Sequence, residues 1–144
     1  MAPTTTNASL TIGFTGGRGG ASSKQLRSLR SLLAGCTGEL HHGDCIGADA
    51  SAHSIALALG FSIFIHPPAD PRKRAFCAGA VKVFHAMPYL VRNVVIVRST
   101  SCLIACPHSS QEQLRSGTWS TIRFARSLAR PVFLILPDGS IIEE

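Results

Sequence analysis

The sequence has no long hydrophobic run and no secretory leader. No apolar segment approaches the roughly 20 residues that a membrane-spanning helix needs. The amino-terminal residues, MAPTTTNAS, contain neither the basic region nor the apolar core of a signal peptide. These absences argue against a membrane or secreted protein, so we expect a cytoplasmic location. We interpret residues 1–9, which are mostly polar, as a disordered lead-in.

Paired cysteine motifs are also absent. The five cysteines are an odd number and include no CxxC spacing, which a zinc site or a redox pair would normally show. His42, His53 and His66 are spaced like no compact set of metal ligands. We therefore expect reduced thiols, no metal site and no cofactor, with His53 as a structural histidine.

Acidic residues are scarce. The chain has 8 Asp and Glu against 14 Lys and Arg, so its formal net charge is +6. Arginine supplies most of the positive charge, because the only lysines are Lys24, Lys73 and Lys82. A guanidinium group can bind a phosphate through two parallel hydrogen bonds. The composition therefore favours an anionic partner, although net charge does not separate a mononucleotide from a nucleic acid.

What the sequence does contain is an alternation of short apolar strands and helical segments. We expect strands at residues 10–15, 39–42, 61–65, 102–106 and 132–136, and helices at 22–34, 52–59, 89–98 and 117–130. Residues 69–87 are interpreted as a loop with one helical turn. Apolar strands separated by helices are typical of a parallel sheet that is covered on both faces. We predict one α/β domain over residues 10–144, a Rossmann-like, doubly wound, mainly parallel five-stranded sheet with helices on both faces.

A glycine-rich turn, TGGRGG, follows the first expected strand. Glycines let the backbone approach an anion closely, and the start of the following helix offers free N–H groups. The turn matches neither the dinucleotide-binding fingerprint nor the Walker A loop. We predict that Thr15, Gly16, Gly17 and Arg18 bind a phosphate, the alternative being a tight turn without a ligand.

Residues 41–49, HHGDCIGAD, end the second expected strand and lead into a helix. Asp44 and Asp49 flank this turn, where a carboxylate can hold a ribose hydroxyl or stabilise positive charge during glycosidic cleavage. The alternative is that either carboxylate caps the helix. Gly43, in the same turn, is predicted to bind the phosphate or nucleotide, and three more residues at strand ends are candidates for the pocket: His42, His66 and Pro67.

A second phosphate-binding turn is expected at Arg115, Ser116, Gly117 and Thr118, which open the last helix. The two hydroxyl groups lie beside free helix N–H groups, and the arginine can neutralise a phosphate.

Three side chains from other positions are candidates for the same ligand. Arg92 could neutralise a phosphate, and Asn93 follows it in the preceding helix. Trp119 could stack on a base or pack in the core.

The order of these motifs resembles the SLOG superfamily of Rossmann-like proteins. This superfamily includes the Lonely Guy (LOG) phosphoribohydrolases and the DprA single-strand DNA-binding proteins. The segments GFTGGR, HGDCIGADASAH and LRSGTWSTIRFAR are similar to those of small stand-alone members in the YspA or YpsA-like group. The resemblance covers nearly all of residues 12–140 and implies a homodimer formed through helices beside the cleft.

LOG enzymes carry an Arg-Lys pair before a strand that ends Ala-Leu-Pro, and then a PGGxGTxxE loop. The matching residues here are Arg92 and Asn93, the segment IACP at residues 104–107, and Gly117 and Thr118. The resemblance implies that Arg92 contacts the substrate and that Gly117 and Thr118 hold its 5′-phosphate.

The sequence departs from the LOG pattern at the catalytic glutamate. A longer insertion replaces the PGG half of the loop, and the glutamate falls on Thr121. Because that glutamate performs the acid or base step in LOG enzymes, another carboxylate would have to replace it. The candidates are Asp44, Asp49 and Glu112.

Three functions follow from these features. The leading hypothesis is binding of a nucleotide or nucleotide-derived small molecule at the carboxyl-terminal edge of the sheet, with hydrolysis of the N-glycosidic bond of a nucleoside 5′-phosphate as its catalytic form. The second is a non-catalytic sensor of a nucleotide signal, which Thr121 favours. The third is DprA-like binding of single-stranded DNA, although one Trp and one Tyr offer no clear stacking platform.

Overall fold

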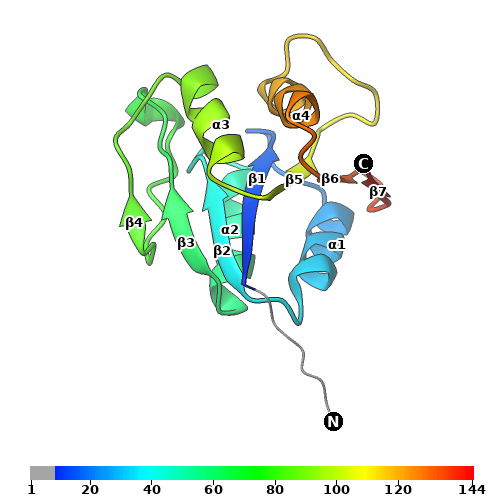
Figure 1. Cartoon of the computed structure of the whole chain (residues 1–144), viewed down its shortest axis with the longest axis horizontal. Coiled ribbons are helices and arrows are strands. Elements are labelled where there is room, and N and C mark those ends of the chain that lie inside the picture. Colours follow the sequence, from blue (N-terminus) through cyan, green and yellow to red (C-terminus); the bar gives the residue numbers. More distant parts are fainter. Residues whose placement is uncertain (1–8) are drawn as a thin grey trace.

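A seven-stranded sheet forms the centre of the protein, and helices cover both of its faces (Figure 1). The structure, a computed structural model, describes residues 9–144. The strands are β1 Leu10–Gly16, β2 Gly38–His42, β3 Ser62–Ile65, β4 Lys82–Val83, β5 Cys102–Cys106, β6 Val132–Ile135 and β7 Ile141–Glu143. Their order is β4-β3-β2-β1-β5-β6-β7, and only the β6–β7 pair is antiparallel. The prediction of a Rossmann-like α/β fold is confirmed.

The predicted number of strands, five, is wrong because two short edge strands were not expected. β4 lies in the segment interpreted as a loop, after the 3-10 turn Pro71–Lys73, and β7 ends the chain. All residues of β4 and β7 are exposed. An exposed edge strand carries no burial pattern in its sequence, so it cannot be told from a loop. The predicted lead-in falls on residues 1–9, of which 1–8 lie outside the described residues.

Two helices pack on each face of the sheet. Helices α1 (Ser23–Leu33) and α2 (Ala48–Ala58) contact each other on one face, and α3 (Tyr89–Arg98) and α4 (Gly117–Ser127) do so on the other. Ser22 and Gln25 form a capping box at the start of α1, and Gly60, with φ +92°, ends α2. No helix within residues 9–144 is long and apolar enough to cross a membrane.

The strand order reverses beside β1. From β1 the chain passes through α1 to β2 on one side, while β5 on the other side leads through α4 to β6. In open α/β sheets the crevice at the carboxyl ends of such strands is the usual ligand site. Because β1, β2 and β5 are parallel, the residues that follow Gly16, His42 and Cys106 lie at the same edge.

Gly16 allows α2 to approach this edge closely. A Cβ atom added at Gly16 would lie 2.5 Å from the Cβ of Ala48, the first residue of α2. The amide of Ala48 also donates a hydrogen bond of 3.1 Å to the carbonyl of Gly17. These contacts bring the first glycine turn beside residues 43–49.

Candidate functional site

A cavity of about 320 Å³ lies at the edge of the sheet where the strand order reverses. This volume is at the lower end of the range for small-ligand pockets, roughly 300 to 1,000 Å³. The predicted site residues that line it are Thr15, Gly16, Gly17, Arg18, Gly43, Asp49, Arg92, Asn93, Arg115, Ser116, Gly117 and Thr118. The two predicted phosphate turns therefore face one cavity.

Several lining residues were not selected from the sequence. Phe14 and Ile96 add apolar surface, while Cys45, Pro68 and Lys73 come from the loops beside α2 and β3. The run RKR at residues 72–74 is a signal that could have identified the lysine. The two apolar residues carry no such signal, because only the packing decides which side of a strand or helix faces a cavity.

Some predicted pocket residues do not line the cavity. His42, His66, Pro67 and Trp119 are buried elsewhere, and His66 contributes only its backbone carbonyl, to Arg92. Trp119 is 3% exposed and packs with Ile122 in the core between the sheet and α4. Of its two alternative interpretations, packing in the core is the one that matches this position.

The first glycine turn contributes its backbone, but the helix after it does not reach the cavity. The hydroxyl of Ser22, the N-cap of α1, accepts from the amide of Gln25 at 3.0 Å and donates to the carbonyl of Pro137 at 2.7 Å. The start of α1 is therefore held by Pro137, which does not line the cavity. The expectation that this helix start offers its N–H groups to the ligand is corrected: the helix beside the turn in the cavity is α2.

The second turn places a helix start directly at the cavity. Gly117 and Thr118 are the first two residues of α4, and such residues have no intrahelical acceptor for their N–H groups. Ser116 is the N-cap, and its hydroxyl accepts from the amide of Trp119 at 3.2 Å. Thr121, at the LOG glutamate position, is 2% exposed and donates to the carbonyl of Gly117 at 2.8 Å. Thr121 thus stabilises the turn from behind and does not line the cavity.

Arg92 is a buried cation in the wall of the cavity. It is 5% exposed. Its Nη1 donates to the carbonyls of Gly43 at 2.6 Å and His66 at 3.1 Å, and its Nε donates to Asn93 at 2.7 Å. Among the described residues it forms no ion pair with a carboxylate. A buried charge is normally paired, so an anion bound in the cavity would supply the missing counter-charge.

Asp49 is the only carboxylate of the described residues that lines the cavity. It lies in the first turn of α2, is 5% exposed, and accepts from the amide of Cys45 at 3.1 Å. Burial raises the pKa of Asp49 to about 6, although the amide of Cys45 and the charge of Arg92 act in the opposite direction. Such a group can exchange a proton near neutral pH. Its position and its pKa make it the candidate acid or base of this site.

Asp44 does not face the cavity, which corrects its assignment as a candidate catalytic residue. Its carboxylate is fully buried, accepts from Arg74 Nε at 2.7 Å and from the amide of Cys77 at 3.0 Å. Burial works against ionisation, but these two hydrogen bonds outweigh it and lower the pKa of Asp44. Nor does it cap α2, whose N-cap is Gly47. Asp44 instead fixes the segment around residues 74–77 against the β2–α2 turn.

Glu112, the third carboxylate considered as a substitute, also lies outside the cavity. It is exposed and pairs with Arg123 at 2.9 Å and with Arg126 at 3.2 Å. Asp49 is therefore the remaining candidate to replace the LOG glutamate.

The histidines behind the site form hydrogen bonds that require neutral rings. The amide of Asp44 donates to Nδ1 of His42 at 2.9 Å, so His42 carries its proton on Nε2 and donates to Nδ1 of His53 at 2.9 Å. Nε2 of His53 then donates to the carbonyl of Ala78 at 2.7 Å. Burial, together with the neighbouring His53, lowers the pKa of His42 to about 3. Burial also lowers the pKa of His66 to about 4.

Among the described residues, no group of three His, Cys, Asp or Glu could hold a metal ion.

These pKa values predict that the protein loses stability in mild acid. Below pH 6.5 the unfolded chain binds protons at His42 and His66 that the folded protein does not bind, so the free energy of unfolding falls as the pH falls. The raised pKa of Asp49 has the opposite effect, because between its folded pKa of about 6 and its ordinary pKa of 3.8 the folded protein binds a proton that the unfolded chain does not. The net loss between pH 7 and pH 5 is expected to be about 2 kcal/mol in urea unfolding. Asp49→Asn removes the opposing effect of Asp49, so its free energy of unfolding should fall more steeply with pH than that of the wild type. A fall no steeper than in the wild type would contradict this account.

The charges around the cavity are mostly positive. Arg18, Lys73, Arg92 and Arg115 line it, opposed by Asp49 alone among the described residues. Together with the free N–H groups at the start of α4, these cations form a site suited to a small anion such as a phosphate.

Solved structures of other proteins share this fold. The molybdenum cofactor binding protein from Rippkaea orientalis is 22% identical, with a TM-score of 0.67 over 91% of this chain and 78% of that one. The molybdenum cofactor carrier protein from Chlamydomonas reinhardtii is 18% identical, with a TM-score of 0.65 over 92% of this chain and 78% of that one. At these identities the similarity establishes the fold alone.

DNA processing protein A (DprA) from Streptococcus pneumoniae has the same fold. It is 19% identical, with a TM-score of 0.63, and 88% of this chain matches 50% of that one. DprA is one of the SLOG proteins that the motifs resemble, so the fold is consistent with that superfamily, while a place in the YspA-like group stays a prediction.

A scan of protein-family models found no match, and a search of curated proteins found no significant match.

Proposed function

We propose that the cavity binds a nucleotide or a nucleotide-derived phosphorylated small molecule. The observation that carries this proposal is Arg92, a buried cation in the cavity wall that forms no ion pair within residues 9–144. The phosphate would lie between Arg92 and the start of α4, where Gly117 and Thr118 offer N–H groups. Two proteins of the same fold bind or carry the molybdenum cofactor, so this cofactor is a further ligand to test.

The rest of the cavity suits the remainder of such a ligand. Phe14, Pro68, Tyr89 and Ile96 provide apolar and aromatic surface, and Asp49 can accept a hydrogen bond from a sugar hydroxyl. Polar groups concentrated at one end and apolar surface elsewhere are typical of small-molecule sites.

Hydrolysis of an N-glycosidic bond is the second candidate function, and Asp49 favours it. Water would add to the anomeric carbon while the C–N bond breaks, giving the free base and a sugar phosphate. Asp49 would accept the proton of the water, which then passes to the departing nitrogen of the base, or it would stabilise the positive charge at the anomeric carbon. Thr121 replaces the LOG glutamate and lies outside the cavity, so a site without turnover is the alternative.

Titration calorimetry with the four nucleoside 5′-monophosphates, adenosine, inorganic phosphate and a short oligodeoxynucleotide tests the binding proposal. We expect the monophosphates to bind and adenosine to bind much more weakly, because the phosphate supplies the counter-charge for Arg92. Thr118→Val removes one hydroxyl from the cavity and should weaken binding about 10-fold, while Thr37→Val, at an exposed site outside it, should have no effect.

The outcomes of this titration separate the candidates. Equal affinity for adenosine and its monophosphate would contradict the proposal, and salt-sensitive binding of the oligonucleotide alone would favour a DNA partner. The same mixtures are then assayed for free base by chromatography. Release by the wild type that disappears in Asp49→Asn would assign the hydrolase, whereas binding without release would assign the sensor.

A further inference from the structure

The loop of residues 107–116 connects β5 to α4 and delivers two residues to the cavity. It leaves the sheet after Cys106 and extends away from it before returning to the start of α4 (Figure 1). Its last two residues, Arg115 and Ser116, line the cavity. Most of the loop is exposed, and the side chain of Leu114 is 87% exposed. Its conformation therefore depends on a few polar contacts.

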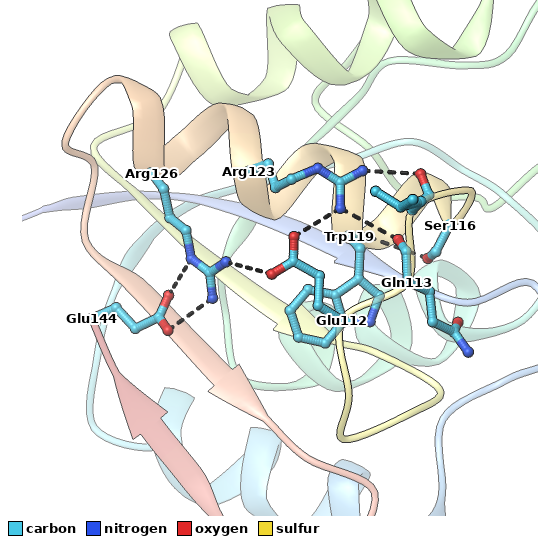
Figure 2. Close-up of polar contacts among 8 residues, drawn as sticks. Glu112, Gln113, Ser116, Trp119, Arg123, Arg126 and Glu144 are labelled. Atoms are coloured by element: carbon cyan, nitrogen blue, oxygen red, sulfur yellow. Dashed lines mark hydrogen bonds and ion pairs between the residues drawn. The ribbon is translucent and has the colours of Figure 1, made fainter.

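Two arginines of α4 make most of these contacts. Arg123 donates through Nη1 to Glu112 at 2.9 Å and to the carbonyl of Gln113 at 3.3 Å, and through Nη2 to the carbonyl of Leu114 at 3.1 Å. Figure 2 shows the guanidinium of Arg123 between these loop residues and α4. Three consecutive loop residues are thus tied to one side chain, directly before Arg115.

Glu112 joins the second arginine to this cluster. Its Oε1 accepts from Arg126 at 3.2 Å, and Arg126 also forms two hydrogen bonds with Glu144 of the chain terminus, at 2.7 and 2.9 Å (Figure 2). A single exposed ion pair contributes little to stability. A carboxylate shared by two arginines, with two backbone carbonyls bound as well, restrains a loop better than an isolated pair.

Trp119 lies beside the two arginines on α4. Residues 119, 123 and 126 form one stripe of α4, and Arg126 lies over the indole at 5.9 Å. The indole Nε1 is buried and has no hydrogen-bond partner in the part of the chain that the structure describes. A buried donor without an acceptor is destabilising. Arg126 of the cluster thus covers one side of the indole.

We propose that Glu112, Arg123 and Arg126 are positioning residues that hold the loop of residues 107–116 on α4. None of the three lines the cavity, and they act through Arg115 and Ser116, which do. The inference rests on the proposed function. Arg115 contributes to the binding of a phosphate, and the cluster keeps Arg115 in the position from which it does so.

The test uses Glu112→Gln, which keeps the shape of the side chain and removes its charge. Trp119 is the only tryptophan and Arg126 lies over its indole, so acrylamide quenching of its fluorescence reports whether the Glu112–Arg126 cluster stays in place in the ligand-free protein. We expect the quenching constant to rise about two-fold or more as the indole becomes accessible, and the dissociation constant for adenosine 5′-monophosphate to rise about 5-fold. Glu143→Gln, the same charge change at an exposed residue of β7, should alter neither.

The dependence on Arg115 separates positioning from a general loss of stability. In an Arg115→Ala background, Glu112→Gln should weaken binding no further, because the two substitutions act on one contact. Unchanged quenching, or increased quenching with unchanged affinity, would overturn the inference while the wild type still binds the nucleotide. If the wild type binds no monophosphate, the proposed function fails and the positioning inference fails with it.

Discussion

Replacing Gly43 with alanine is expected to remove most of the affinity of the cavity for a nucleoside monophosphate. A Cβ atom at this position would overlap the guanidinium of Arg92, whose Nη1 donates to the carbonyl of Gly43. Arg92 would have to move, leaving the carbonyls of Gly43 and His66 without this donor. The displaced guanidinium would also lose its charged hydrogen bond to the phosphate, which costs about 2–3 kcal/mol, so we expect the dissociation constant to rise roughly 100-fold.

A matched glycine variant controls for the general cost of adding a methyl group. Gly19 lies in the first glycine turn, and a Cβ atom there would meet nothing within 4 Å. Gly19→Ala should therefore bind adenosine 5′-monophosphate as the wild type does in calorimetry. Wild-type affinity in Gly43→Ala would show that Arg92 does not hold the anion.

Replacing Asp44 with alanine is expected to cause the largest loss of stability among the substitutions considered. Its buried carboxylate pairs with Arg74 and accepts from the amide of Cys77. Removing one partner of a buried pair costs about 3 kcal/mol or more. The backbone adds to this cost, because Asp44 has a φ of +55°, a conformation that aspartate and asparagine tolerate better than alanine does. Urea unfolding should show this loss.

Two further variants identify the source of that loss. Asp44→Asn keeps the tolerated backbone and an acceptor for Cys77, so it should lose clearly less stability than Asp44→Ala. Asp70→Ala removes a half-buried aspartate that pairs with the exposed Arg72 and caps the turn Pro71–Lys73, and it should cost clearly less stability than Asp44→Ala. If Asp44→Ala were no less stable than Asp70→Ala, the ion pair with Arg74 would not support the fold.

Asp44→Ala should also disturb the wall of the cavity, because Asp44 holds a segment that lines it. The carbonyl of Asp44 accepts from the amide of Ala75 at 2.7 Å, and the carbonyl of Lys73 accepts from the amide of Ile46 at 3.1 Å. These contacts hold the segment that presents Lys73 to the cavity. Asp44 therefore supports the cavity wall without lining the cavity.

Local sequence patterns were enough to predict the architecture and the two turns. The capping box at Ser22, the glycine at residue 60 and the apolar strands are local signals, because the residues that create them are neighbours in the chain. Parallel strands bring their carboxyl ends to one edge, so the predicted turns could be expected to meet there. β4 and β7 were not expected, because exposed edge strands have no such pattern.

The identity of the functional side chains was decided only by the tertiary structure. Asp44 and Asp49 are five residues apart and look alike in the sequence, yet one pairs with Arg74 and the other lines the cavity. The difference arises because Arg74 approaches from a distant segment and because the left-handed backbone at residue 44 redirects its side chain. The sequence by itself determined the five central strands, the helices and the two turns at the edge of the sheet. Which charge is neutralised and which faces the ligand depended on contacts between residues far apart in the chain, which no local pattern encodes.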